Sequence, residues 1–422
     1  MGETRMMIRT IFSLILASFL LAAAPVFAAG TPAQEYIESE KAETRDPVTI
    51  LISIDGFRPD YLERGITPNL GALATSGIYG PMRPSFPSKT FPNHWTLVTG
   101  KTPDHHGIVG NTMEDPARPG EIFKMATQDP FWWNQAEPIW ITAEKQGIRS
   151  ATMFWPGSEV ELNGLRPADW WPFNQKLSND RRVNAVIDWM RRPTAIRPRL
   201  VTLYFDTVDT AGHYFGPAPG KQLHAAIAAV DSEIGRLKQH LDQMGQPVNF
   251  VIVSDHGMTE TSPERIIHLD QIMPRDQYHL VEGGNYVGIE PLEDNREAVR
   301  AAFLRPHEHM ECWDRENIPA HFAYGKNPRV PSIFCLVEIG WVGLQDVPEW
   351  MTGVGGGHGY DHREADMLAF FLANGPAIAA DGQLSLFDNL DIYSLVARLA
   401  GIAPQPGDGS LAPFETSLRP RK

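Results

Sequence analysis

The sequence VTILISIDGFR, residues 48–58, joins a run of apolar and β-branched residues directly to an Asp-Gly pair. Such a run, closed by turn residues, predicts a strand over 48–54 that is buried on both faces, as in a parallel sheet. Similar runs predict further strands at residues 149–154, 200–205, 248–253 and 367–372.

Helical periodicity occurs between these runs. Apolar residues recur every three or four positions from 222 to 244, and Gly245 then ends the pattern, which predicts a long amphipathic helix. Two shorter helices are predicted at 68–76, with Thr67 as N-cap, and at 389–400, with Asp388 as N-cap. Strands that alternate with helices predict an α/β fold with a largely parallel central sheet flanked by helices on both faces.

Length and charge limit the possible classes of protein. The chain has 422 residues, an ordinary 42% of hydrophobic residues, and 37 basic against 51 acidic residues, a net charge of −14. This composition excludes general disorder and argues against sequence-specific nucleic-acid binding. We predict one catalytic domain over 47–422, in which residues 262–350, rich in Pro, Gly and polar loops, form an insertion or cap.

The first residues predict a secretory signal peptide over 1–28. Arg5 and Arg9 precede an apolar run at 11–24, and Val26-Phe27-Ala28 provides a small-residue cleavage site. The run is shorter than the ~20 residues of a membrane span. We therefore expect a polar lead-in at 29–46 and a periplasmic or secreted protein with no span after cleavage.

Export also affects the interpretation of Cys312 and Cys335, the two cysteines of the chain. In an oxidising compartment such a pair is expected to form a disulfide. Two buried thiols remain the alternative, and neither cysteine has the spacing of a metal site.

Acidic and imidazole side chains follow the predicted strands. In an open α/β sheet, ligands bind outside the carboxyl ends of the strands. Mixed Asp and His ligation suits Zn²⁺, whereas Mg²⁺ and Ca²⁺ prefer oxygen ligands. The sequence therefore predicts a metal site at this edge, although a single Asp-Gly is more often a turn. The candidate ligands are Asp55, Asp209, His213, Asp255, His256 and His358.

A candidate nucleophile occurs in residues 83–100, RPSFPSKTFPNHWTLVTG. Pro92 suits the first turn of a helix, so Thr90 is expected at the helix N-terminus, where backbone N–H groups attract a phosphoryl oxygen. A bound metal would activate its hydroxyl. The alternatives are that Thr90 only caps the helix, or that Ser85 or Ser88 is the nucleophile.

Seven blocks of sequence, in order, resemble the nucleotide pyrophosphatase/phosphodiesterase family of the alkaline phosphatase superfamily. The resemblance spans residues 48 to about 400 and implies an alkaline phosphatase-like fold, here in an exported, bacterial member that consists of the catalytic domain. The blocks are residues 54–58, 89–94, 97–100, 106–111, 209–213, 254–258 and 358–361.

The resemblance implies two zinc ions per chain, because the family holds one with each of two ligand sets. One set is Asp209, His213 and His358, and the other is Asp55, Asp255, His256 and the Thr90 oxygen. It also implies a phospho-threonine intermediate at Thr90.

The resemblance assigns further roles around the nucleophile. Asn111 would donate to a phosphoryl oxygen beside the Phe91 N–H, and Phe91 would stack on a nucleobase. The Gly-His-Gly pattern favours His358 over His362 as the ligand. Tyr204 is either part of the same slot or a core aromatic. Asp361 and Asp366 are expected to be structural, and Asp206 either orients Asp209 or is a solvated turn residue.

The expected substrate is a small nucleotide or another phosphodiester, hydrolysed with release of a nucleoside monophosphate. A phosphomonoesterase, a phosphonate hydrolase or a choline or lipid phosphodiesterase remains an alternative on the same fold. A sulfatase is excluded because neither cysteine lies in the C/S-x-P-x-R motif that matures to formylglycine. The sequence leaves the oligomeric state open.

Overall fold

The structure is a computed structural model that describes residues 45–348, 353–380 and 382–420. The predicted signal peptide at 1–28 and all but the end of the lead-in lie outside the described residues. Residues 45–422 form one compact unit. No helix among the described residues is long and apolar enough to cross a membrane.

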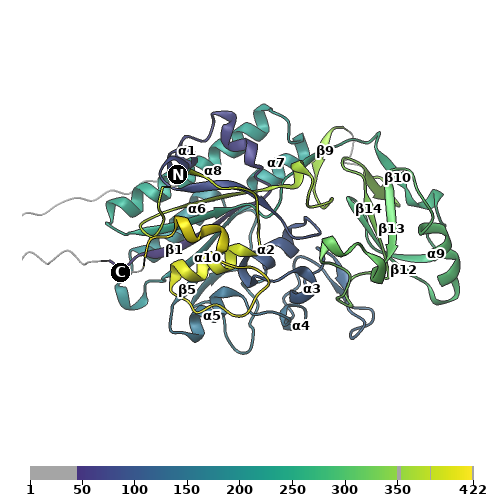
Figure 1. Ribbon diagram of the computed structural model, residues 1–422, viewed down its shortest axis with the longest axis horizontal. Coiled ribbons are helices and arrows are strands. Elements are labelled where there is room, and N and C mark those ends of the chain that lie inside the picture. Colours follow the sequence, from purple (N-terminus) through teal and green to yellow (C-terminus); the bar gives the residue numbers. More distant parts are fainter. Residues whose placement is uncertain (1–44, 349–352, 381, 421–422) are drawn as a thin grey trace, which may run out of the picture. The chain divides into compact units, whose positions relative to one another are not determined.

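A large mixed sheet forms the centre of this unit (Figure 1). Within the described residues its strand order is β18-β2-β17-β8-β1-β7-β5-β6, with β19 also paired to β2. The predicted strands appear as β1, β5, β7, β8 and β17. The strand bounds are β1 Val48–Ile54, β2 Ile78–Arg83, β5 Ser150–Met153, β6 Asp169–Trp171, β7 Leu200–Phe205, β8 Val248–Val253, β17 Ala369–Asn374, β18 Gly382–Gln383 and β19 Phe387–Asp388.

Strand β1 lies in the middle of the sheet, parallel to both β7 and β8. Its alternating residues enter two separate cores. Ile50 and Ile52 pack in the cluster that includes residues of helix α8, whereas Leu51 packs in the cluster that includes residues of helices α2 and α10. This burial on both faces explains the unbroken apolar run. The β17 strand is the exception to the parallel order, since it runs antiparallel to β8 and β2.

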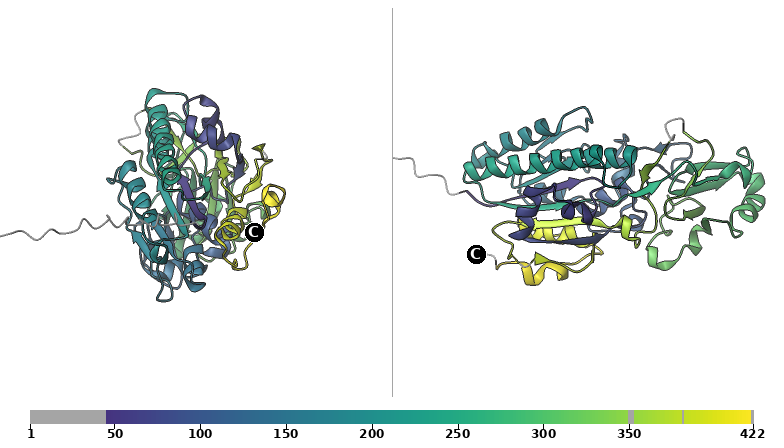
Figure 2. Two further views of the ribbon diagram at one scale, coloured as in Figure 1. Left: turned by 90° about the vertical axis from the view of Figure 1, so that its left-hand side faces the viewer. Right: turned by 90° about the horizontal axis from the view of Figure 1, so that it is seen from above.

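Helices cover both faces of the sheet, as Figure 2 shows from above. Helices α1, α6 and α7 contact α8 on one side, and α10 packs on α2 on the other. The α/β class with a largely parallel sheet is therefore confirmed. The helix bounds are α1 Pro68–Thr75, α2 Thr90–Thr99, α3 Pro103–His106, α4 Pro130–Trp133, α5 Ile139–Lys145, α6 Asn179–Met190, α7 Thr207–Phe215, α8 Lys221–Gln243, α9 Arg296–Phe303 and α10 Asp391–Ala400.

Of the two predicted N-cap positions, one is confirmed and one is wrong. Thr67 is the N-cap residue of α1, although its hydroxyl donates to the Leu62 carbonyl and makes no capping hydrogen bond. Helix α10 begins at Asp391, with Leu390 at its N-cap. Asp388 cannot cap it, because this residue belongs to β19, which pairs with β2.

The region at 262–350 contains a sheet of its own. Strands β11 (Tyr278–Glu282), β12 (Tyr286–Pro291), β14 (Ile333–Val337) and β13 (Met310–Asp314) form an antiparallel sheet in that order, with α9 against β12. Cys312 and Cys335 lie opposite each other on β13 and β14 and are joined by a disulfide.

Candidate active site

The candidate ligands come from four places in the fold. Asp55 directly follows β1, and Asp255 and His256 follow the neighbouring strand β8 after one serine. Asp209 and His213 lie on α7, which begins just after β7. Their spacing of four residues places both side chains on the same face of that helix. This arrangement brings three neighbouring strands, β8, β1 and β7, to one site, as predicted from their carboxyl ends.

The source of His358 differs from the prediction. It follows β16 (Gly355–Gly357), which pairs with β9 (Thr259–Thr261) in a separate two-stranded sheet. The glycines are necessary here because a Cβ on Gly356 would lie 2.4 Å from the Gly212 carbonyl oxygen. Close packing of this glycine run on α7 brings His358 beside His213.

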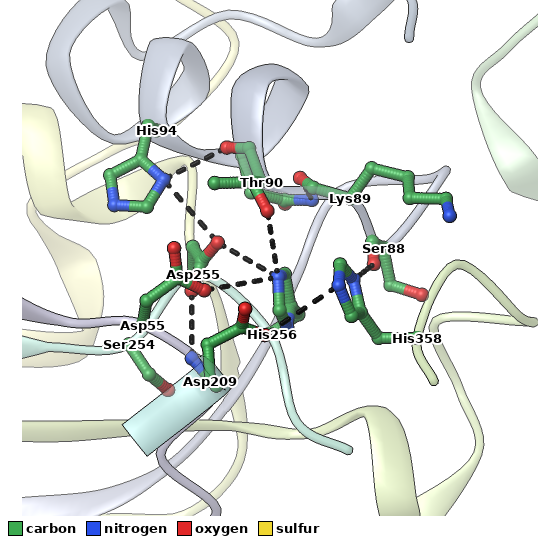
Figure 3. A network of polar contacts seen from close by, with 12 residues as sticks. Asp55, Ser88, Lys89, Thr90, His94, Asp209, Ser254, Asp255, His256 and His358 are labelled. Carbon is green, nitrogen blue, oxygen red and sulfur yellow. Dashed lines mark hydrogen bonds and ion pairs between the residues drawn. The ribbon is translucent and has the colours of Figure 1, made fainter. Parts of the chain in front are cut away.

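One group of side chains surrounds the Thr90 hydroxyl (Figure 3). The His256 Nε2 atom lies 3.3 Å from Thr90 Oγ1, 3.0 Å from Asp255 Oδ2 and 3.4 Å from Asp55 Oδ1. Asp55, Asp255 and His256 are buried, and their ligand atoms all lie within 4.8 Å of one another. These distances would allow one cation to contact all of them.

A second group lies next to it. The Nε2 atoms of His213 and His358 are 3.2 Å apart, and the Asp209 Oδ1 atom lies 3.4 Å from the first and 3.7 Å from the second. His256 also reaches this group, because its ligand atom lies within 4.8 Å of those of Asp209 and His358. All six predicted ligands therefore converge, with His256 between the two groups.

The three imidazoles share one orientation. In each ring Nδ1 lies within hydrogen-bonding distance of a backbone carbonyl: Gly356 for His213, Gly257 for His256, and Ser88 for His358. The remaining Nε2 atoms all face the carboxylates. Metal-binding histidines are commonly held this way, because the outer hydrogen bond fixes the tautomer and the ring orientation.

Three carboxylate oxygens in the cluster have no hydrogen-bond partner. They are Asp55 Oδ1, Asp209 Oδ1 and Asp255 Oδ2, and all three are buried. Burying carboxylate oxygens without a hydrogen-bond donor is costly, and of the three only Asp255 Oδ2 lies within 3.3 Å of imidazole nitrogens, those of His256 and His94. Together with three Nε2 atoms the carboxylate oxygens form the mixed oxygen and nitrogen donor set that suits Zn²⁺. The residues present therefore fit a divalent metal site.

Burial and the neighbouring charges shift the pKa values of two candidate ligands, Asp55 and His358, in the protein without metal. Burial raises the pKa of Asp55 well above its usual range, and the Asp255 and Asp209 carboxylates raise it further. Burial lowers the pKa of His358 well below its usual range, and the nearby His256 adds to that effect. Without metal, the Asp255 and Asp209 carboxylates thus oppose ionisation of Asp55. His358 is kept neutral, which is the form that binds metal.

Thr90 is the first residue of α2, with Lys89 at the N-cap. The Thr90 hydroxyl faces His256, whose Nε2 lies 3.3 Å away. Asn111 lies beside it, and its Oδ1 accepts from the Phe91 N–H at 3.0 Å. This contact differs from the expectation that the Phe91 N–H and the Asn111 amide both face a substrate, because here the N–H is already bonded.

The competing serine hydroxyls are directed elsewhere. Ser85 Oγ donates to Asn389 Oδ1 at 2.9 Å, and Ser88 Oγ donates to the Tyr360 carbonyl at 2.8 Å. Neither lies within hydrogen-bonding distance of a candidate ligand side chain among the described residues. Thr90 is therefore the hydroxyl that the fold places at the cluster.

The other candidate residues are structural. His362 packs against Phe86 and Phe322, away from the cluster, so His358 is the histidine of this segment that joins it. Asp361 pairs with Arg363, Asp366 pairs with Arg58, and Asp206 is buried against Arg182. Asp206 is thus neither a solvated turn residue nor a direct partner of Asp209.

His94 is a further residue of the site that was not predicted, and its side chain is fully buried. Its Nδ1 lies 2.8 Å from the Thr90 carbonyl oxygen and 3.3 Å from Asp255 Oδ2, and its Nε2 lies 2.8 Å from Ser53 Oγ. Because His94 lies four residues after Thr90 on α2, it links the helix start to a candidate ligand. Helical spacing from Thr90 was the available signal.

Tyr204 has a role that the sequence did not indicate. It is buried, and its hydroxyl donates to Asp55 Oδ2 at 2.5 Å. The parallel pairing of β1 with β7 sets Tyr204 opposite Ser53, two residues before Asp55. Tyr204 also lines the cavity described below, so it both orients a candidate ligand and borders the ligand space.

We expect Tyr204→Phe to lower metal affinity or kcat/KM by about 10–100-fold, the usual effect of losing a partner of a metal ligand. The ring and its packing survive, so the melting temperature of the metal-free protein should change little. Metal titration and steady-state kinetics on the same preparation test this. Unchanged metal affinity and unchanged kcat/KM would show that the Asp55 contact has no orienting role.

A cavity of about 830 Å³ opens over the cluster. Asp55, Thr90, Asp209, His213 and His358 form its polar floor. The aromatic residues in its walls are Phe91, Trp133, Phe154, Trp155, Trp171, Phe173, Tyr204 and Tyr214. Such a cavity has the size and the mixture of apolar walls and convergent polar groups of a small-molecule site.

Comparison with known proteins agrees with this geometry. Residues 49–361 match the family described as type I phosphodiesterase / nucleotide pyrophosphatase. Xenopus laevis bis(5'-adenosyl)-triphosphatase enpp4 is 35% identical over 87% of this chain and 80% of its own length. Human ectonucleotide pyrophosphatase/phosphodiesterase family member 5 is 34% identical over 86% of this chain and 76% of its own length.

Solved structures show the same fold. Human ectonucleotide pyrophosphatase/phosphodiesterase 5 superposes with a TM-score of 0.84 at 33% identity, over 88% of this chain and all of the other. An inactive threonine-to-alanine variant of the murine protein, in complex with AMP, gives the same TM-score at 32% identity, over 89% of this chain and all of the other. These relatives are eukaryotic, so they do not test the expected bacterial origin. The chain belongs to the type I phosphodiesterase / nucleotide pyrophosphatase family and is a hydrolase of the phosphodiesterase class.

Proposed function

We propose that this protein is a two-zinc phosphodiesterase and pyrophosphatase that releases a nucleoside monophosphate from small nucleotide substrates. The observation that carries the proposal is the position of Thr90, whose hydroxyl lies at the helix start beside two Asp/His groups and opens into an aromatic cavity. The AMP complex of the murine relative supports a nucleotide as the substrate.

Each residue of the site has a proposed task. Asp55, Asp255, His256 and the Thr90 oxygen would hold one zinc ion, and Asp209, His213 and His358 the other. When bound, a zinc pair neutralises the carboxylates and stabilises charge that develops on the attacking and leaving oxygens.

The Thr90 oxygen would attack phosphorus and displace the leaving alcohol or phosphate, which forms a phospho-threonine diester that still carries the nucleoside. Water would then break the bond between phosphorus and the Thr90 oxygen, with release of the nucleoside monophosphate and return of the proton to the Thr90 hydroxyl. Near the start of α2, Thr90 occupies a position where backbone N–H groups favour a negatively charged phosphoryl group. The Asn111 side-chain amide would donate to a non-bridging oxygen, and the Phe91 ring at the cavity wall would stack on the base.

Export remains a further part of the proposal. The Cys312–Cys335 disulfide suits an oxidising compartment, as does the signal peptide predicted at 1–28. A periplasmic or secreted location is testable by fractionation of cells that express the full chain. Retention of an uncleaved chain in the cytoplasm would contradict it.

The metal requirement gives the first test of this proposal. We expect the purified enzyme to contain about two zinc ions per chain, to lose its activity in a chelator and to regain it with Zn²⁺, because six neutral or anionic ligand groups converge. Elemental analysis and reactivation assays measure this. Active protein that contains only calcium, or no metal, would contradict it.

Discrimination between diesters and monoesters gives the second test. No arginine is among the described residues that line the cavity, so a doubly charged phosphoryl group finds no guanidinium clamp. We expect kcat/KM for a nucleotide phosphodiester to exceed that of the matching monoester at least tenfold. A choline phosphodiester serves as the control for base recognition. A hundredfold preference for the monoester, ~2.7 kcal/mol in transition-state terms, would make the phosphodiesterase assignment wrong.

A further inference from the structure

The cavity is poor in positive charge. None of the described residues that line it is lysine or arginine. Outside the metal-binding cluster, its charged side chains are Glu159 and Asp206. Asp206 is already neutralised by Arg182 at 2.7 Å, so Glu159 leaves an excess negative charge in the wall. Among the described residues that line the cavity, none offers a lysine or arginine to a substrate, so the counter-charge there would come from the proposed metal pair.

The nearest buried cations are turned away from the substrate space. Lys89 immediately precedes Thr90, but Figure 3 shows its amino group directed away from the cluster, and its Nζ donates to Asn285 Oδ1 at 3.4 Å. Arg182 donates to the Leu177 and Tyr204 carbonyls as well as to Asp206. Arg182 is thus committed to the protein. Lys89 is not among the residues that line the cavity, although its charge acts on His358 and Asp209.

The side of the cavity that would receive the leaving group is neutral as well. In an in-line displacement this group departs opposite the Thr90 oxygen, next to Asp209, His213 and His358. The lining residues of α7 at that place are Thr210 and Tyr214, and Tyr214 is exposed. Neither side chain can neutralise a β- or γ-phosphate.

We propose that the site selects phosphodiesters with an uncharged alcohol as leaving group, such as dinucleoside monophosphates, over nucleoside triphosphates. A polyphosphate leaving group would exchange hydration for a cavity whose lining has no lysine or arginine and includes the Glu159 carboxylate. That carboxylate accepts from the Phe173 N–H but forms no ion pair with a described residue, so binding of the polyphosphate costs free energy and association is slowed. This selectivity rests on the proposed function, and it departs from the triphosphatase activity named for the Xenopus relative.

The direct test compares AMP release from a dinucleoside monophosphate, with adenosine as leaving group, and from ATP, with pyrophosphate as leaving group. Pyrophosphate is the better leaving group, so a preference for the dinucleotide has to come from the site. We expect kcat/KM to favour the dinucleotide at least tenfold at low salt. The gap should narrow as salt rises, because screening weakens the repulsion of ATP.

A matched pair of variants isolates the charge. Tyr214→Lys adds a cation at the leaving-group side, and Tyr214→Gln removes the same ring without adding charge. Relative to the Gln variant, the Lys variant should raise the ratio of kcat/KM for ATP to that for the dinucleotide about tenfold, since an opposite charge close to the leaving phosphates favours them. Circular dichroism and melting curves confirm that both variants are folded.

Equilibrium binding separates recognition from chemistry. In a Thr90→Ala background, calorimetry should show that Tyr214→Lys tightens binding of ATP more than binding of the dinucleotide. Faster AMP release from ATP than from the dinucleotide in the wild-type enzyme, or an unchanged ratio in the Lys variant, would overturn the selectivity alone. No AMP release from either substrate would instead overturn the proposed function and this selectivity with it.

Discussion

Replacing Thr90 with alanine should lower kcat/KM for a nucleotide diester by about a thousandfold or more. The substitution removes the attacking oxygen and one proposed metal ligand together, and groups that act as a unit lose most of their effect when one is removed. The hydroxyl lies 3.3 Å from His256 Nε2, and Lys89, not Thr90, is the N-cap residue of α2, so we expect a loss of chemistry with little effect on stability.

Thr90→Ser is the matched control, because it keeps the hydroxyl and removes a methyl group. This variant should retain far more activity than Thr90→Ala, and both should melt within a few degrees of the wild type. Acid quenching during turnover of a diester labelled at phosphorus should trap the labelled nucleoside phosphate on Thr90. Label on Ser85 or Ser88, or a fully active Thr90→Ala enzyme, would refute the proposed nucleophile while leaving the metal site intact.

Much of the fold could be predicted because its signals are local. The strands at 48–54, 200–205 and 248–253 coincide with β1, β7 and β8, since a sheet buried on both faces requires unbroken apolar runs. Asp55 and Asp255 lie together because each follows one of two adjacent parallel strands. The general rule for carboxyl ends of strands thus anticipated half of the site.

The remaining features depend on tertiary contacts that the sequence does not display. Tyr204 reaches Asp55 through the register of β1 and β7, and the alternation of apolar residues does not fix that register. His358 arrives from the β16–β9 pair, and a glycine run is a weak strand signal. The α7 helix that holds Asp209 and His213 was not predicted, although their four-residue spacing was visible in the sequence.

Asp55→Asn should abolish most activity. It should also make the protein more stable than the wild type without metal and less stable than the wild type with bound Zn²⁺. Asp55 follows β1 at the centre of the sheet, and its Oδ1 is buried without a hydrogen-bond partner. Asparagine fills the same space but binds metal poorly, so we expect about one metal ion per chain to be lost and kcat/KM to fall by about a thousandfold or more.

The stability of this variant tests whether the carboxylates are arranged for metal. Without metal, burial and the charges of Asp255 and Asp209 raise the pKa of Asp55, so its ionised form opposes folding. Asp55→Asn removes that charge, while its amide oxygen can still accept from Tyr204.

The metal-free variant should therefore melt about 2 °C or more above the metal-free wild type at neutral pH. With saturating Zn²⁺ the order should reverse, because metal stabilises the folded wild type in proportion to its tighter binding. Calorimetry of both proteins, with chelator and with Zn²⁺, measures the two differences. A wild type that is more stable under both conditions would show that the three carboxylates do not repel one another enough to need a bound cation. The cluster would then be a structural network instead of a metal site.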